Sequence, residues 1–135
     1  MPKLEYIIPC LQIIQDTNTN SMSYINALEG LRSNTADITL PAVYIGLRWI
    51  KDAGQDKEEV LIAARLSVID PDGMPVRDAV LFKIKMTKRR HRHNVILQNL
   101  ILKNQGDYKI IVEQKDNGDW LKAGESIITL EVVND

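Results

Sequence analysis

The sequence predicts an all-β protein, an antiparallel β-sandwich of seven to nine strands, and three observations support this. Runs rich in Val, Ile, Leu and Tyr recur along the chain and are separated by Asn, Asp, Gly or Pro. Several runs alternate apolar and polar residues with a period of two, which puts one set of side chains against a core. Asp70–Gly73 and Asp116–Asp119 have the composition of tight turns.

We expect strands near residues 4–14, 22–31, 41–51, 58–70, 78–87, 93–102, 107–115 and 126–133. The alternation is clearest in the strands near 58–70, 78–87 and 107–115, and polar loops are expected near 15–21, 32–40 and 52–57. The segment 22–31 is ambiguous because Met22, Ile25, Leu28 and Leu31 lie three apart, as on a helical face. Gly30 weakens a helix, so we favour a strand there.

The length and composition indicate one ordinary globular domain, residues 1–135. No apolar run approaches the roughly 20 residues of a membrane helix. The formal net charge of −1 argues against nucleic acid as the default partner. Cys10 is the only cysteine, which excludes an internal disulfide, and the N-terminus lacks the pattern of a signal peptide. We therefore expect a cytoplasmic protein.

Tyr108 follows a turn at the start of a late strand, in Gly106-Asp107-Tyr108. There its hydroxyl can bond back to upstream backbone as a tyrosine corner; the alternative is a plain core tyrosine.

Several short segments together resemble a family of uncharacterised small bacterial proteins. They are Leu4-Glu5-Tyr6-Ile7, Tyr24-Ile25-Asn26-Ala27, Pro41-Ala42-Val43-Tyr44, the run from Arg65 to Gly73, Asn99-Leu100 and Gly106 to Val112. The resemblance covers most of the chain and implies an immunoglobulin-like sandwich, but it implies no activity. The basic run at 88–93 departs from the family's pattern.

The sharpest local feature is this basic run, Lys88-Arg89-Arg90-His91-Arg92-His93. It falls between two strands, where a hairpin tip would project dense positive charge, and Lys83 and Lys85 extend it on an outward face. Phosphate, single-stranded nucleic acid or an acidic protein surface would suit such a patch. The candidate anion-binding residues are Lys83, Lys85, Lys88, Arg89, Arg90 and Arg92. The alternative is a solvated loop.

Other chemistry has less support. His91 and His93 share a face in an extended strand and are weak candidates for zinc or copper ligands, but a site needs further ligands. Asp70, Asp72, Asp107, Asp116 and Asp119 are explained by turn chemistry as well as by calcium binding. No catalytic motif is recognisable, and Cys10 lies among apolar residues where a thiol is usually inert. We therefore expect no enzyme activity and no cofactor.

Three expected strands, 4–14, 41–51 and 93–102, carry apolar residues on both faces. A sandwich buries only one face of each sheet, so these strands predict apolar surface for a partner. The leading hypothesis is a non-enzymatic interaction module that binds protein, including itself as a homo-oligomer. The alternatives are an anion or nucleic-acid binder using residues 83–93 and, third, a metal-dependent enzyme.

Overall fold

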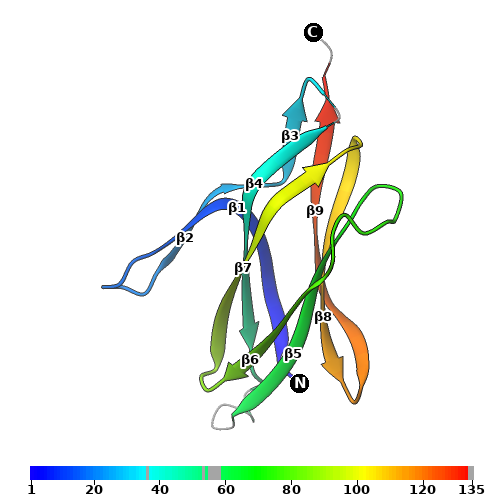
Figure 1. The fold of residues 1–135 in the computed structure, drawn as a ribbon. Coiled ribbons are helices and arrows are strands. Elements are labelled where there is room, and N and C mark those ends of the chain that lie inside the picture. The colour runs from blue at the N-terminus through cyan, green and yellow to red at the C-terminus, as the bar shows by residue number, and fades with distance from the viewer. Residues whose placement is uncertain (36, 53, 55–58, 134–135) are drawn as a thin grey trace.

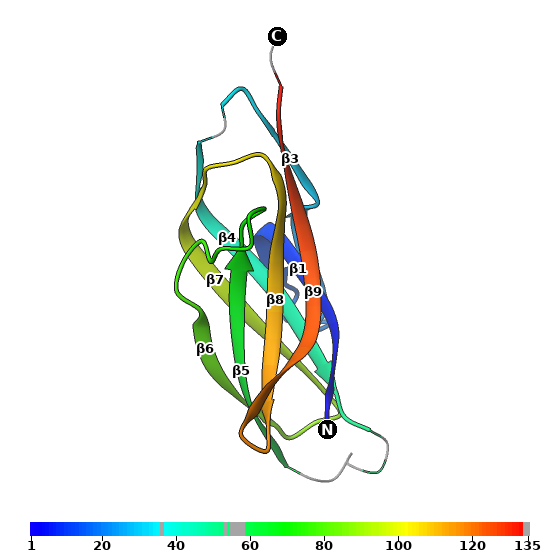
Figure 2. The same cartoon turned by 90° about the vertical axis from the view of Figure 1, so that its right-hand side faces the viewer.

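Nine β-strands form two facing sheets in the computed structural model, which describes residues 1–35, 37–52, 54 and 59–133 (Figure 1). The strands are β1 (Lys3–Gln15), β2 (Met22–Ala27), β3 (Gly30–Ser33), β4 (Ile38–Ile50), β5 (Val60–Ile69), β6 (Val80–Met86), β7 (Arg90–Leu102), β8 (Gly106–Asp116) and β9 (Asp119–Val132). Sheet A has the order β2-β1-β4-β7 and sheet B the order β3-β9-β8-β5-β6. Figure 2 views sheet B face-on. The all-β sandwich prediction is confirmed.

The core lies between the sheets and follows the predicted alternation. Alternate residues of β4 point inward from sheet A, and alternate residues of β5 and β8 meet them from sheet B. The buried side chains of these three strands include Val43, Ile45, Leu47, Trp49, Ile62, Ala64, Leu66, Val68, Tyr108, Ile110 and Val112. The described residues include no helix that is long and apolar enough to cross a membrane.

The ambiguous segment 22–31 is extended, but it forms parts of two strands in different sheets. β2 pairs with β1 in sheet A, and β3 pairs in parallel with β9 in sheet B. Between them Leu28 enters the core, and Asn26 has a φ of 55°, which lets the chain turn. The apolar spacing of three therefore reflects a change of sheet rather than a helix.

The last strand begins earlier than predicted, at Asp119 rather than 126, and runs directly from the turn. Gly124 obscured this in the sequence, because glycine weakens a strand pattern. A Cβ at residue 124 would lie 3.0 Å from a Leu4 methyl group and 3.2 Å from one of Ile7. Glycine therefore allows β1 to approach β9 closely.

Both predicted turn signals are confirmed. Asp116 pairs with Asp119 across a two-residue turn in which Asn117 and Gly118 have φ values of 50° and 87°. The Asp70 carboxylate accepts hydrogen bonds from the amides of Asp72 and Met74. The loop expected near 52–57 and the first residue of the strand expected at 58–70 fall mostly outside the described residues.

The tyrosine corner is present. The Tyr108 hydroxyl donates to the Asn104 carbonyl at 2.6 Å and accepts from the Asn104 amide at 3.0 Å. Since Tyr108 is also buried in the core, one side chain fixes the turn before β8 and packs between the sheets.

The strand expected at 93–102 exposes less apolar surface than its sequence indicates. Val95 and Leu97 are buried, and so are Leu100 and Leu102, which have the opposite parity. Asn99 between them has a φ of 52°, so the alternation changes phase there. Ile96 and Ile101 keep 52% and 45% of their surface exposed.

Candidate anion-binding groove

The predicted basic stretch is divided between the two outer faces of the sandwich. Lys83 and Lys85 point outward from β6 on sheet B, where Lys85 lies 3.5 Å from Glu59. Lys88 and Arg89 lie in the crossover to sheet A, where the Arg89 carbonyl accepts from the amide of Lys51. Arg90 and Arg92 lie on β7 in sheet A. The six residues therefore do not form one continuous patch.

A further arginine joins the two on β7. Arg48 of β4 is directly opposite Arg92 in the register of the two strands, and Ile50 is opposite Arg90. Since paired residues share a face, Arg48, Arg90 and Arg92 all belong to the outer face of sheet A.

The hairpin formed by β1 and β2 projects from the outer side of sheet A, away from sheet B (Figure 1). Asp16 organises its tip: the carboxylate accepts from the amides of Asn18 at 2.8 Å and Thr19 at 3.3 Å. These two hydrogen bonds lower the pKa of Asp16. The Asp16 carbonyl accepts from the amide of Asn20, whose φ is 59°. The tip therefore has a defined shape.

Tyr24 fastens this hairpin to the sheet. Its ring occupies the space above Gly46 of β4, where a Cβ would lie 2.3 Å from Cε1 of the ring. The hydroxyl groups of Tyr24 and Tyr6 are hydrogen-bonded, and the rings meet edge to face with centroids 5.8 Å apart. Burial and then the bond to Tyr6 raise the pKa of Tyr24, so this hydroxyl is neutral at physiological pH.

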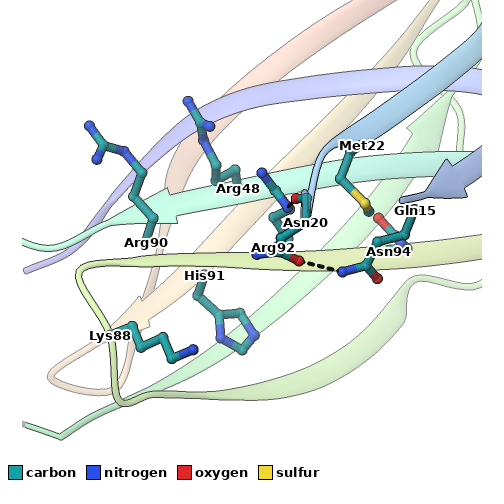
Figure 3. Close-up of a pocket in the computed structure, with 9 residues that line it drawn as sticks. All are labelled: Gln15, Asn20, Met22, Arg48, Lys88, Arg90, His91, Arg92 and Asn94. Atoms are coloured by element: carbon teal, nitrogen blue, oxygen red, sulfur yellow. Dashed lines mark hydrogen bonds between the residues drawn. The ribbon is translucent and has the colours of Figure 1, made fainter. Parts of the chain in front are cut away.

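A groove of about 360 Å³ lies between the hairpin and the outer face of sheet A (Figure 3). The hairpin supplies Gln15, Asn20 and Met22. The remaining lining residues are Arg48, Lys88, Arg90, His91, Arg92 and Asn94. The lining contains four cationic side chains and no carboxylate, together with amide side chains that can donate hydrogen bonds.

One carboxylate beside the groove serves two of its arginines. Glu5 Oε1 lies 2.9 Å from Arg48 Nε and 3.5 Å from Arg90 Nε. The buried Arg48 Nε is thus ion-paired, although its alignment is not that of a hydrogen bond, and its guanidinium lies 4.9 Å from the centre of the Tyr6 ring. Arg92 donates to the Asn20 carbonyl at 2.7 Å. Among the residues that the structure describes, the cluster therefore holds more positive charge than its one carboxylate balances.

The two histidines share a face, as predicted, but it is the face opposite to the arginines. His93 stacks on Phe82 of sheet B with ring centroids 4.6 Å apart. Burial lowers the pKa of His91, and burial followed by the charge of His91 lowers the pKa of His93. Both rings are therefore neutral near pH 7, and the charge of the groove comes from arginine and lysine.

The weaker candidates are not brought together. Within the described residues, no group of three or more His, Cys, Asp or Glu side chains is placed to hold a metal ion. Cys10 is fully buried, and burial raises the pKa of its thiol. The Asp107 carboxylate accepts a hydrogen bond from Thr129, and Asp70 serves its own turn.

The sequence reasoning missed Glu5, Tyr24, Gly46 and Arg48. Arg48 could have been found from its outward parity among the inward Leu47 and Trp49. Its proximity to Arg92 follows only from the pairing of β4 with β7, which are separated in the chain by β5 and β6. No sequence signal links Tyr24 to Gly46.

Comparison of the sequence with models of known families and with curated proteins finds no match. The class of protein is therefore defined by the fold and the site alone: a two-sheet β-sandwich with an arginine-lined groove beneath a docked hairpin.

Proposed function

We propose that this protein is a non-enzymatic binding module that holds an anionic ligand in the groove between the β1–β2 hairpin and sheet A. The observation that carries the proposal is the arginine cluster: Arg48, Arg90 and Arg92 come together from adjacent strands, and among the described residues Glu5 is the only carboxylate that pairs with them. Guanidinium groups match the geometry of phosphate and carboxylate oxygens. The volume is in the range of a small-ligand pocket.

Part of the cluster is preorganised. The Glu5 and Tyr6 contacts hold Arg48, and the Asn20 carbonyl holds Arg92, so their side chains lose little further freedom on binding. Ligand oxygens would accept hydrogen bonds from Arg48 and Arg90 while Glu5 stays paired with them. At Arg92 a ligand oxygen would take the place of the Asn20 carbonyl as the acceptor.

The test is titration calorimetry with inorganic phosphate and pyrophosphate in a buffer of low ionic strength. Arg90→Gln and Arg92→Gln should each weaken binding about tenfold or more, since a hydrogen bond to a charged group contributes about 1.5–3 kcal/mol. The control is Lys83→Gln/Lys85→Gln, which removes two charges from the opposite outer face. Equal weakening by the control would show only general attraction and would contradict the proposal.

The immunoglobulin-like classification, and with it the resemblance to the small bacterial family, is part of this proposal. Two features support it: the tyrosine corner at Tyr108, and the arrangement in which strands distant in sequence, such as β1 and β4 or β5 and β8, are neighbours.

Self-association is a second candidate function, and a specific observation favours it. Leu61 of β5 and Leu81 of β6 are 73% and 69% exposed on neighbouring strands of sheet B. Exposed leucines on a sheet face suit a symmetric contact between two copies. Native mass spectrometry should then give a dimer that Leu61→Ser/Leu81→Ser converts to monomer, whereas a monomeric parent protein would exclude this candidate.

A further inference from the structure

β7 is an edge strand of sheet A. Its thirteen residues pair with β4 on one side, and in the described part of the chain no strand lies on its other side. Backbone N–H and C=O groups of a strand point alternately to its two edges, so a row of them faces outward from the sandwich. Arg77 reaches the far half of this edge, at 3.4 Å from the Gln98 carbonyl. In the first half of β7, from Arg90 to Ile96, no strand of the described residues pairs with this outer edge, so another strand can pair there.

The groove reaches this free edge. Arg90, Arg92 and Asn94 line it from the outer face of β7, yet His91, of opposite parity, lines it too. In Figure 3 His91 projects from the other side of the β7 ribbon from Arg48 and Arg90. Consecutive residues of one strand line one hollow where the hollow passes around the strand, and it does so here at the Arg90 end of β7, where Lys88 also lines it.

We infer that β7 accepts an extended acidic peptide as an added strand, with carboxylates at alternate positions against Arg90 and Arg92. This inference rests on the proposed function, because it uses the same arginines, and it adds the class of partner. In an added strand alternate side chains fall on the same face. The acidic residues would therefore meet the arginines, and the residues between them would lie on the side of His91.

Two other occupants of the β7 edge, a second copy of the chain and a single-stranded nucleic acid, fit less well. A second copy that paired through the same strand would bring no carboxylate, because Arg90–Leu102 contains neither Asp nor Glu. A single-stranded nucleic acid needs a continuous basic track and free aromatic rings. Here Lys83 and Lys85 lie on the opposite outer face, and Tyr6 and Tyr24 are engaged with each other.

The test uses the intact protein and a peptide of about seven residues that alternates glutamate and threonine, the length of the free half of the edge. Titration calorimetry should show binding that Arg90→Gln/Arg92→Gln weakens at least tenfold. Two N-methylated versions of the peptide, with methyl groups on alternate amides, keep every charge. Only one should lose binding, because only one set of amides faces β7.

Amide hydrogen exchange supplies a second measurement. Peptide binding should slow exchange at alternate residues between Arg90 and Ile96, since the other amides are already bonded to β4. Equal effects of the two methylated peptides, or no alternating protection, would overturn the strand addition.

The controls separate this inference from the proposed function. If phosphate binds through Arg90 and Arg92 but the peptide does not bind, the inference fails and the anion site stands. If neither ligand binds, both fail. Tighter binding of oligothymidylate than of the peptide, with the same dependence on the two arginines, would assign the groove to nucleic acid and overturn the peptide.

Discussion

Two arginines on opposite faces of the sandwich have nearly the same immediate surroundings. Arg48 on sheet A lies 2.9 Å from Glu5 and 4.9 Å from the centre of the Tyr6 ring. Arg65 on sheet B lies 2.8 Å from Glu113 and 4.4 Å from the centre of the Trp120 ring. The side chains of the two ion pairs are also similarly exposed, 29% and 24% in the first and 33% and 23% in the second.

What differs is the wider setting. Glu5 also pairs with Arg90, and Arg92 of β7 is directly opposite Arg48 of β4. Three guanidinium groups therefore gather beneath the β1–β2 hairpin. Arg65 donates to Glu113 on an outer face where neighbouring β6 presents Leu81, Lys83 and Lys85, and Lys115 lies 5.7 Å from the centre of the same Trp120 ring. An arginine held between a carboxylate and an aromatic ring is thus a structural feature of both sheets. The sharing of Glu5 by two arginines and the groove beneath the covering hairpin make only Arg48 part of a candidate binding site.

The largest expected effect comes from detaching the hairpin. Gly46→Ala places a methyl group where the Tyr24 ring lies, so the ring and the hairpin must move. We expect a loss of about 1–3 kcal/mol in the free energy of unfolding, the usual consequence of overpacking. Urea denaturation measures the loss, and faster amide exchange in residues 12–25 locates it.

Gly30→Ala is the matched control, because a Cβ there would make only an ordinary 3.7 Å contact with the Thr129 carbonyl. It should change stability by less than about 0.5 kcal/mol. Equal losses in the two variants would mean that Tyr24 does not hold the hairpin on sheet A.

A smaller effect distinguishes the two ion pairs directly. Glu113→Gln should destabilise by about 0.5 kcal/mol, as for an ordinary half-exposed pair. Glu5→Gln should destabilise by about 1 kcal/mol at low salt, because it removes the carboxylate shared by Arg48 and Arg90, and less at high salt, which screens the repulsion between the arginines. The same variant should bind phosphate more tightly than the parent protein.

Urea denaturation at low and high salt checks both values, and calorimetry checks the phosphate affinity. If Glu5→Gln and Glu113→Gln change stability and phosphate affinity alike, the two faces are equivalent, and the groove is not a specific anion site.

The smallest effect concerns pH. The pKa of His93 is lowered in the folded protein, so the unfolded chain binds a proton more readily, and stability falls as pH drops below the unfolded pKa of about 6.5. His93→Phe keeps a ring against Phe82 and removes this titration, so its stability should fall less between pH 7 and the folded pKa. The pKa of His91 is also lowered, so the slope of stability against pH should be reduced in the variant rather than abolished. Identical slopes in the two proteins, measured by urea denaturation across this range, would contradict this account.

Much of the fold could be predicted from alternation and turn chemistry. The inward sets on β5 and β8, the turns at Asp70 and Asp116 and the corner at Tyr108 all depend on residues close together in the chain. Predictions failed in detail at two single residues. Gly124 leaves space for Leu4 and Ile7 of β1, and the positive φ of Asn99 changes the phase of the alternation within β7.

The candidate site could be predicted only in part. Arg90 and Arg92 were evident as a basic run, and the same run led to Lys83 and Lys85, which lie on the other face. The run crosses from one sheet to the other at Lys88, and the composition of the run gives no sign of the crossing.

By itself, then, the sequence determined the all-β character, the inward faces of the alternating strands and the local turns, because these follow from periods of two and from the backbone preferences of Gly, Pro, Asn and Asp. The tertiary structure alone decided which charges meet. Glu5, Arg48 and Arg90 come from three strands whose neighbourhood is set by strand order and register, and the hairpin is docked by a ring that fits above a glycine. Coulombic interactions depend on distance in space, and in a sandwich that distance is fixed by pairing between strands far apart in the chain.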